Sequence, residues 1–182
     1  MRDTKYKGFT LIELMVTLSV SAILLTVGIP SFRSMTLNNK RNTEINKLVT
    51  DLAVARSESI KRGFNVSVCK SNDNATCSGT WADGWIVFVN TDNDIPAVVD
   101  AGELIIRVSQ GSNWVPSGEY STHITYSPTG FVNSGGHLKY CDDRGAKFAR
   151  AVILEISGRT TLSTDSNNNR THEDENGSDL TC

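Results

Sequence analysis

Residues 9–29 form an almost continuous apolar run that contains one charged side chain, Glu13. A helix of this length would be about 30 Å long, which matches the hydrocarbon thickness of a bilayer. Arg2, Lys5 and Lys7 precede the run, and such a basic flank favours a cytoplasmic start of the chain. The segment is therefore predicted to cross a membrane once.

Glu13 is the residue that a plain membrane segment does not explain, because a carboxylate buried in hydrocarbon costs about 2.5 kcal/mol or more on insertion scales. An ordinary secretory signal would end in a small-residue cleavage site, whereas this run continues through Gly28 and Pro30 into further helical sequence. The segment could be a cleaved secretory signal or a simple membrane anchor. Neither gives Glu13 a role.

Residues 7–14, K-G-F-T-L-I-E-L, resemble the prepilin cleavage motif of type IV pilins and type II secretion pseudopilins. The resemblance implies that a prepilin peptidase cuts between Gly8 and Phe9 and methylates the new amino group of Phe9. It also implies that Glu13 neutralises the N-terminal ammonium of a neighbouring subunit, and that Pro30 bends the helix.

The helical pattern continues after Pro30 to about Arg62, before Gly63. Apolar residues recur at three- and four-residue spacing, namely Ile45, Leu48, Val49, Leu52 and Ala53 or Ala55. The expected polar face carries Lys40, Arg41, Glu44, Lys47, Asp51, Arg56 and Glu58. This half of the helix is predicted to be amphipathic and to pack on a sheet.

From residue 64 onward, short β-rich runs alternate with Gly, Asn, Asp and Ser clusters. The predicted strands are residues 65–69, 84–90, 104–109, 123–126, 137–140, 149–157 and 160–163. The segment after Thr164 is too polar to form a core and is predicted to be a long loop held by Cys182.

These elements predict an α+β fold, and the resemblance implies that it is of the type IV pilin kind. A long N-terminal helix, transmembrane in its first half, would pack on a C-terminal antiparallel β-sheet domain. The expected parts are a leader peptide at 1–8, a membrane and filament-core helix at 9–30, the amphipathic half at 31–62 and a β-rich domain at 63–182.

The four cysteines are an even number in a chain with an export signal, which favours disulfide bonds. Three connectivities are possible, and we prefer Cys69 with Cys77 and Cys141 with Cys182. A zinc site is the alternative, but the chain has no C-x-x-C spacing and no close histidine pair. The scattered His123, His137 and His172 are expected to be surface or hydrogen-bonded residues.

No motif of catalysis or cofactor binding is present, so the chain is predicted to be neither an enzyme nor a cofactor protein. The segment from Asp92 to Glu103 resembles a calcium loop in its acidic spacing. However, Pro96 replaces an oxygen ligand and Ala97 replaces the turn glycine. A solvated loop between two strands is the preferred interpretation, and no metal site is predicted.

Three tryptophans could form a contact surface. Trp85 opens an apolar strand and is expected in the core. Trp81 and Trp114 lie in segments rich in Gly, Ser and Pro, and they are the candidates for exposed subunit contacts.

Nearly the whole chain resembles the GspH/FimT family of minor pilins and pseudopilins. The matching phrases are at residues 55–62, 84–89, 140–145 and 157–159. The cysteines near both ends of the globular domain are more similar to FimU/FimT minor pilins than to the secretion pseudopilin GspH. The resemblance implies a structural minor pilin that helps to initiate assembly at the tip of a type IV pilus.

The implied partners are other minor pilins, major pilin subunits and the prepilin peptidase. The implied location is the inner membrane, with a single pass and a cytoplasmic N terminus, and then the extracellular pilus. A GspH-like pseudopilin of a type II secretion system is the first alternative.

A FimT-like DNA-binding pilin for natural transformation is the second alternative, with Arg159 as the possible DNA contact. The G-R-x-R element of such pilins lacks its second arginine here, where Thr161 stands. Loss of residues 1–8 would leave 15 of 18 basic and 19 of 20 acidic side chains, a net charge near −4. Because phosphate binding needs a basic surface, both observations argue against nucleic acid as a partner.

Overall fold

The computed structural model describes residues 8–112, 114–117 and 120–182, and the side chains of 114–117 are not described. Most of the expected leader peptide therefore lies outside the described residues. The chain divides into two compact units, Met1–Asn42 and Thr43–Cys182. We call the described part of the first, residues 8–42, the N-terminal unit, and the second the head. Helix α1, Leu11–Arg62, contributes to both.

The start of α1 is explained by a cap. Thr10 Oγ1 accepts the backbone N–H of Glu13 at 3.2 Å, as an N-cap side chain does. The helix therefore begins two residues after the expected start at Phe9, and it ends at Arg62 as expected. Pro30 lies inside α1 and does not end it.

Several hydroxyl groups of the N-terminal unit donate to carbonyls of their own helix. Thr17 donates to the carbonyl of Leu14 at 2.8 Å, and Ser19 donates to the carbonyl of Met15 at 2.8 Å. Because these hydrogen bonds stay within one helix, Thr17 and Ser19 add no unsatisfied donors to an apolar environment.

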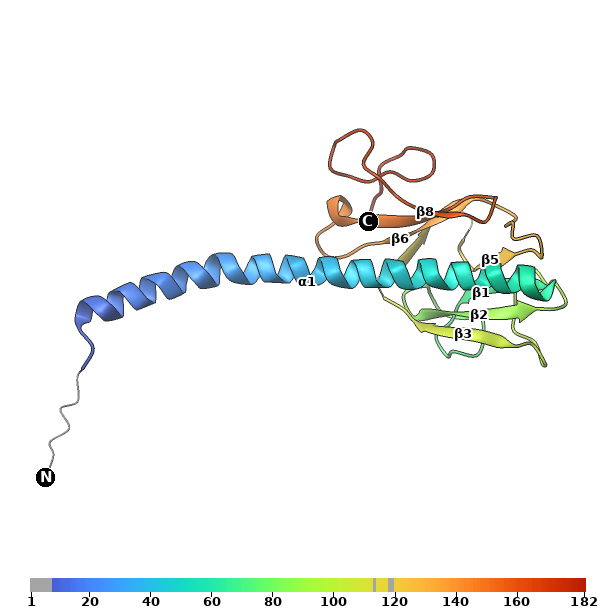
Figure 1. The fold of residues 1–182 in the computed structure, drawn as a ribbon, viewed down its shortest axis with the longest axis horizontal. Coiled ribbons are helices and arrows are strands. Elements are labelled where there is room, and N and C mark those ends of the chain that lie inside the picture. Colours follow the sequence, from blue (N-terminus) through green and yellow to red (C-terminus); the bar gives the residue numbers. More distant parts are fainter. Residues whose placement is uncertain (1–7, 113, 118–119) are drawn as a thin grey trace, which may run out of the picture. The chain divides into compact units, whose positions relative to one another are not determined.

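The head contains two four-stranded antiparallel sheets with the orders β3-β2-β1-β5 and β4-β6-β7-β8 (Figure 1). The strands are β1 Asn65–Lys70, β2 Gly84–Asn90, β3 Ile105–Gln110, β4 Trp114–Ser117, β5 His123–Tyr126, β6 Gly136–Tyr140, β7 Arg150–Leu154 and β8 Thr160–Leu162, with a short 3-10 helix at Ala146–Phe148.

Strand β4 is the element that the sequence prediction missed. It contains Pro116, which cannot donate a ladder hydrogen bond, and it pairs with β6 alone at the edge of its sheet. The strand expected at 149–157 is shorter, because β7 ends at Leu154 and residues 155–158 form a turn before β8.

One core joins the helix to both sheets. A stripe of α1, Ile45, Leu48, Leu52 and Ala55, is buried at alternating spacings of three and four residues. It packs in one cluster with Val68 and Val87 of the first sheet and with Leu138 and Val152 of the second. The expected packing of this half of the helix on a sheet is therefore confirmed.

All seven residues of β2 are buried, which its apolar run predicts. Trp85 and Val87 belong to the core cluster that includes α1. The alternate residues Ile86 and Phe88 belong to a second cluster with Cys69 and Ala97. Both faces of β2 are thus covered, one by the helix and the other by loops.

The chain after β8 runs as loops beside the second sheet (Figure 1). Within these loops an isolated antiparallel bridge pairs Glu173 with Asp179. Leu180 packs with Cys141, Ala149 and Ala151. A disulfide joins Cys182 to Cys141. The structure therefore agrees with the expected long polar loop held at its last residue.

Candidate functional site

The expected cleavage site lies just before α1. Gly8, Phe9 and Thr10 are outside the helix and exposed, with 84% of the Phe9 surface accessible. A peptidase must bind its scissile peptide in an accessible, non-helical form. The peptide bond between Gly8 and Phe9 is therefore accessible, and cleavage there stays a prediction.

Glu13 lies in the first turn of α1 and is exposed. Its neighbours Ile12 and Leu14 are exposed apolar side chains. The carboxylate has no ion-pair partner within the described part of the chain. A lone anion on an apolar helix is suited to take a cation from another molecule, since pairing offsets part of the cost of burying it.

The N-terminal unit exposes an apolar surface along α1. The large apolar side chains that are at least half exposed are Phe9, Leu11, Ile12, Leu14, Met15, Val16, Leu18, Val20, Ile23, Leu24, Leu25, Val27, Ile29, Phe32 and Met35. Helix α1 is long and apolar enough to cross a membrane, by its length and composition. Such a surface needs lipid or other apolar helices to cover it.

Asp51 is a carboxylate of α1 that, unlike Glu13, is buried, and for this residue the sequence prediction was wrong. Periodicity assigned Asp51 to the polar face of α1, but its side chain is fully buried. Trp85 Nε1 donates to its Oδ2 at 2.8 Å, and Ser109 Oγ donates to the same oxygen at 2.5 Å. Arg107 Nε lies 2.7 Å from Oδ1. Asp51 therefore fastens α1 to β2 and β3.

The acidic loop between β2 and β3 uses its carboxylates to hold its own backbone. Asp94 Oδ2 accepts the N–H of Val98 at 2.9 Å, and Glu103 Oε1 accepts the N–H of Thr91 at 2.6 Å. Burial, together with the nearby carboxylates of Asp92, Asp94 and Glu103, raises the pKa of Asp100. The loop connects two paired strands, which fits the preferred interpretation of a strand-connecting loop.

The expectation for Trp81 was wrong. Trp81 is fully buried, and its Nε1 donates to the carbonyl of Tyr120 at 2.8 Å, so it is a core residue. Trp85 is buried as expected. The side chain of Trp114 lies outside the described part of the structure, so its expected role as a contact stays a prediction.

The phrases at 55–62 and 157–159 meet in the structure. Arg56 Nη2 donates to the carbonyl of Ser157 at 2.9 Å. Gly158 has a positive φ of 75°, and a Cβ there would lie 2.0 Å from the carbonyl oxygen of Gly130. The glycine is therefore required for a close backbone approach. Arg159 beside it is exposed, with no ion pair in residues 8–112, 114–117 and 120–182.

The cysteines form two disulfides, Cys69–Cys77 and Cys141–Cys182, in the preferred connectivity. The short loop closed by the first is ordered by Asp73. This carboxylate accepts hydrogen bonds from the hydroxyl and N–H of Thr76 and the N–H of Ala75. These bonds lower the pKa of Asp73 well below its usual range.

Sequence reasoning also missed a cluster of His137, Asp174 and Glu175. Their side chains come together in the fold although nearly forty residues separate the histidine from the acids in the chain. No local motif could have indicated it. Asp51 was missed for a related reason, because its partners lie on strands far along the chain.

Comparisons with known proteins agree with this architecture. Residues 44–158 match the family model of the type II transport protein GspH, and residues 3–29 match the prokaryotic N-terminal methylation motif. No curated protein sequence matches significantly.

Two crystal structures of the type IV minor pilin FimU of Pseudomonas aeruginosa have a similar fold. Their TM-scores are 0.51 and 0.54, at 18% and 19% sequence identity. The alignments cover 68% and 71% of this chain and 92% of each FimU chain. At these identities the similarity establishes the fold.

Proposed function

The chain belongs to the GspH family and has a type IV pilin fold, and on that premise we propose that it is a minor pilin that helps to start assembly of a type IV pilus. The N-terminal unit carries this proposal. An exposed apolar helix with one carboxylate, preceded by an accessible Gly8-Phe9 peptide, is what a subunit needs in order to leave a bilayer and join a helical bundle.

In this proposal the leader peptide is removed between Gly8 and Phe9, and the new amino group of Phe9 is methylated. Cleavage removes the basic flank that holds the start of the chain in the cytoplasm. Glu13 then pairs with the ammonium of a neighbouring subunit. Two charges that would each be costly in an apolar bundle become one satisfied pair.

The same topology defines the proposed location and partners. Before assembly the protein spans the inner membrane once, with its N terminus in the cytoplasm and the head outside. After assembly it is part of an extracellular filament with major pilin subunits and other minor pilins. The prepilin peptidase is the processing partner, and the two disulfides fit an oxidising compartment.

A pseudopilin of a type II secretion system is the second candidate, because the matching family model is described as a type II transport protein. Deletion of the gene in the native host separates the two candidates. We expect surface filaments to fall sharply while protein secretion continues. Loss of secretion with normal surface filaments would replace the proposal by the pseudopilin function.

The pairing role of Glu13 is tested with Glu13→Gln, which keeps the size of the side chain and removes the charge. We expect correct cleavage but at least a tenfold smaller amount of this protein in sheared filaments. Glu58→Gln is the matched control, because Glu58 lies in the head half of the same helix and pairs with Arg62. It should assemble normally.

Mass spectrometry of the mature protein tests the processing step. We expect a chain that starts at a methylated Phe9. A mature protein that starts at an unmodified Met1 would refute the prepilin proposal, and normal assembly of Glu13→Gln would refute the pairing role.

A further inference from the structure

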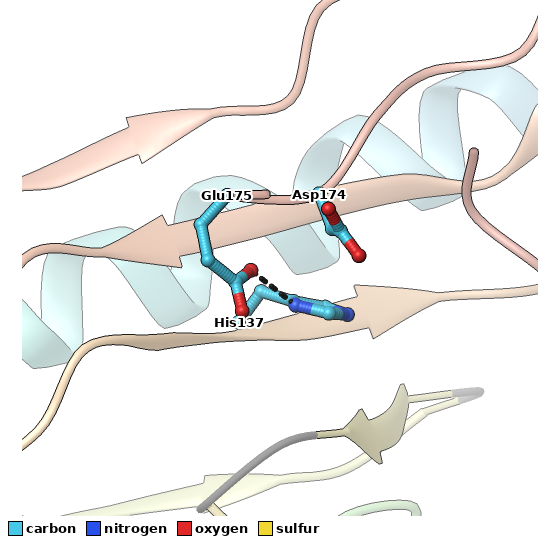
Figure 2. A group of neighbouring side chains, drawn as sticks. All are labelled: His137, Asp174 and Glu175. Atoms are coloured by element: carbon cyan, nitrogen blue, oxygen red, sulfur yellow. Dashed lines mark hydrogen bonds and ion pairs between the residues drawn. The ribbon is translucent and has the colours of Figure 1, made fainter. Parts of the chain in front are cut away.

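The outer face of β6 and the C-terminal loop bring together a group of side chains that has no part in the proposed function. Leu138 and Tyr140 of β6 belong to the core, so the alternate residues His137 and Lys139 lie on the opposite face. The loop after β8 brings Asp174 and Glu175 to His137. Figure 2 shows the imidazole of His137 facing both carboxylates.

The three side chains are close enough to share one ion. One ligand atom from each lies within 4.8 Å of the others. His137 Nδ1 lies 2.5 Å from Glu175 Oε2 (Figure 2). The His137 side chain is only 8% exposed, which fixes its ring, whereas the two acids lie on a more exposed turn.

The turn that carries the acids is ordered by its own backbone. Asp174 Oδ1 accepts the N–H groups of Asn176 at 2.8 Å and of Ser178 at 2.9 Å. Asp174 Oδ2 accepts no hydrogen bond from any residue that the structure describes. The bridge between Glu173 and Asp179 closes the turn behind it. One oxygen of Asp174 is therefore held in position and available.

The chemistry of the donor set selects the kind of ion. One imidazole and two carboxylates suit Zn²⁺ and similar transition dications, whereas Ca²⁺ takes six to eight oxygen ligands. Zinc bonds of about 2.0 Å in a tetrahedral site place ligand atoms about 3.3 Å apart. The ligand atoms lie within 4.8 Å of one another, so binding would require the side chains of the two acids to turn inward by a small amount, and a water would complete the coordination.

A hollow of about 180 Å³ adjoins the cluster and is lined by His137, Lys139, Asp174, Asp179, Leu180 and Thr181. The ammonium group of Lys139 also lines this hollow and repels a cation electrostatically. Its Nζ lies 3.5 Å from Thr181 Oγ1, and the carboxylate of Asp179 lines the same hollow. Because the positive charge of Lys139 repels a cation, its removal should strengthen metal binding, whereas removal of a ligand should weaken it.

We propose that His137, Asp174 and Glu175 bind a transition-metal dication of the Zn²⁺ class, which fastens the C-terminal loop to β6. The ion binds the folded head and stabilises it by mass action. The cysteines are engaged in disulfides, so they do not offer thiolates as competing zinc ligands.

The test uses the full chain in detergent, stripped with a chelator and then titrated with ZnCl₂ by calorimetry and by thermal unfolding. We expect one Zn²⁺ per chain and a higher unfolding temperature. Calcium chloride at the same concentration should give no comparable shift. Asp174→Asn, at a partly exposed position, should weaken zinc binding at least tenfold while the protein stays folded.

Three further variants complete the test. His137→Gln should abolish binding, Lys139→Gln should tighten it, and the matched control Asp92→Asn should bind as the wild type does. Asp92 belongs to the other acidic cluster, with Asp94 and Asp100. The proposal is overturned if the wild type does not bind zinc, if Asp174→Asn binds as tightly as the wild type, or if Asp92→Asn removes the binding.

Discussion

Two of the carboxylates of helix α1 have opposite surroundings. Asp51, in the head, is fully buried and has Trp85, Ser109 and Arg107 as partners. Glu13, in the N-terminal unit, is exposed among apolar side chains. A buried carboxylate with internal partners holds one chain together. An exposed one on an apolar helix needs a partner from another molecule.

The head and the N-terminal unit also differ in the burial of their apolar side chains. The head buries its apolar stripe and closes its loops with two disulfides. The N-terminal unit leaves its apolar side chains exposed. Substitutions in the head should therefore change its stability, whereas substitutions in the N-terminal unit should change assembly alone.

The largest expected effect on stability is that of Leu52→Ala. Leu52 is 1% exposed in the core cluster, so its truncation should lower the free energy of unfolding by about 4 kcal/mol. Leu25→Ala is the matched change in the N-terminal unit, at a side chain that is 59% exposed, and it should leave head unfolding unchanged. Denaturant unfolding of the full chain in detergent, followed by tryptophan fluorescence, compares them. Equal losses of unfolding free energy in the two variants would show that the two units do not differ in this respect.

The disulfides should differ from each other because they close loops of different length. The sequence separation is 41 residues for Cys141–Cys182 and 8 for Cys69–Cys77. The chain-entropy model gives upper estimates of roughly 4 and roughly 2.6 kcal/mol for their removal. We expect the paired Ser variant of the long loop to unfold at lower denaturant than that of the short loop. The reverse order would show that the C-terminal loop contributes little to the head.

The two carboxylates can be compared directly with Asp51→Asn and Glu13→Gln. The first change weakens the hydrogen bonds of Trp85 and Ser109 and leaves Arg107 without its anion, at a cost of about 1 to 3 kcal/mol. The second should not alter the unfolding of the head. Thermal unfolding of both variants checks this, and a stable Asp51→Asn head would show that its network is replaceable.

The smallest expected effect is a pH dependence from His123. Burial lowers the pKa of His123, and the charge of Asp94 opposes this only in part. The folded state then binds fewer protons than the unfolded state, so stability falls as the pH drops through the unfolded value of about 6.5. Unfolding between pH 7.5 and 5.5 should be less pH-dependent in His123→Gln than in the wild type. An identical slope in both proteins would exclude this contribution.

Local patterns predicted much of the fold. The helix end at Arg62 follows from the basic last turn before Gly63, and β2 follows from its apolar run. Strand β4 was missed because Pro116 argues against a strand in the sequence, although a proline is tolerated in an edge strand. Trp81 was misplaced because a polar, Gly-rich neighbourhood indicates a loop but not whether the side chain of that loop turns inward.

The apolar helix, the Gly8-Phe9 motif and the single charge of Glu13 could be recognised in the sequence, because they depend on residues that are adjacent or one helical turn apart. The partners of Asp51, the burial of Trp81 and the meeting of His137 with Asp174 and Glu175 became visible only in the folded chain. Periodicity defines the face on which a side chain lies. The element that covers this face is set by the packing of strands far away in the chain.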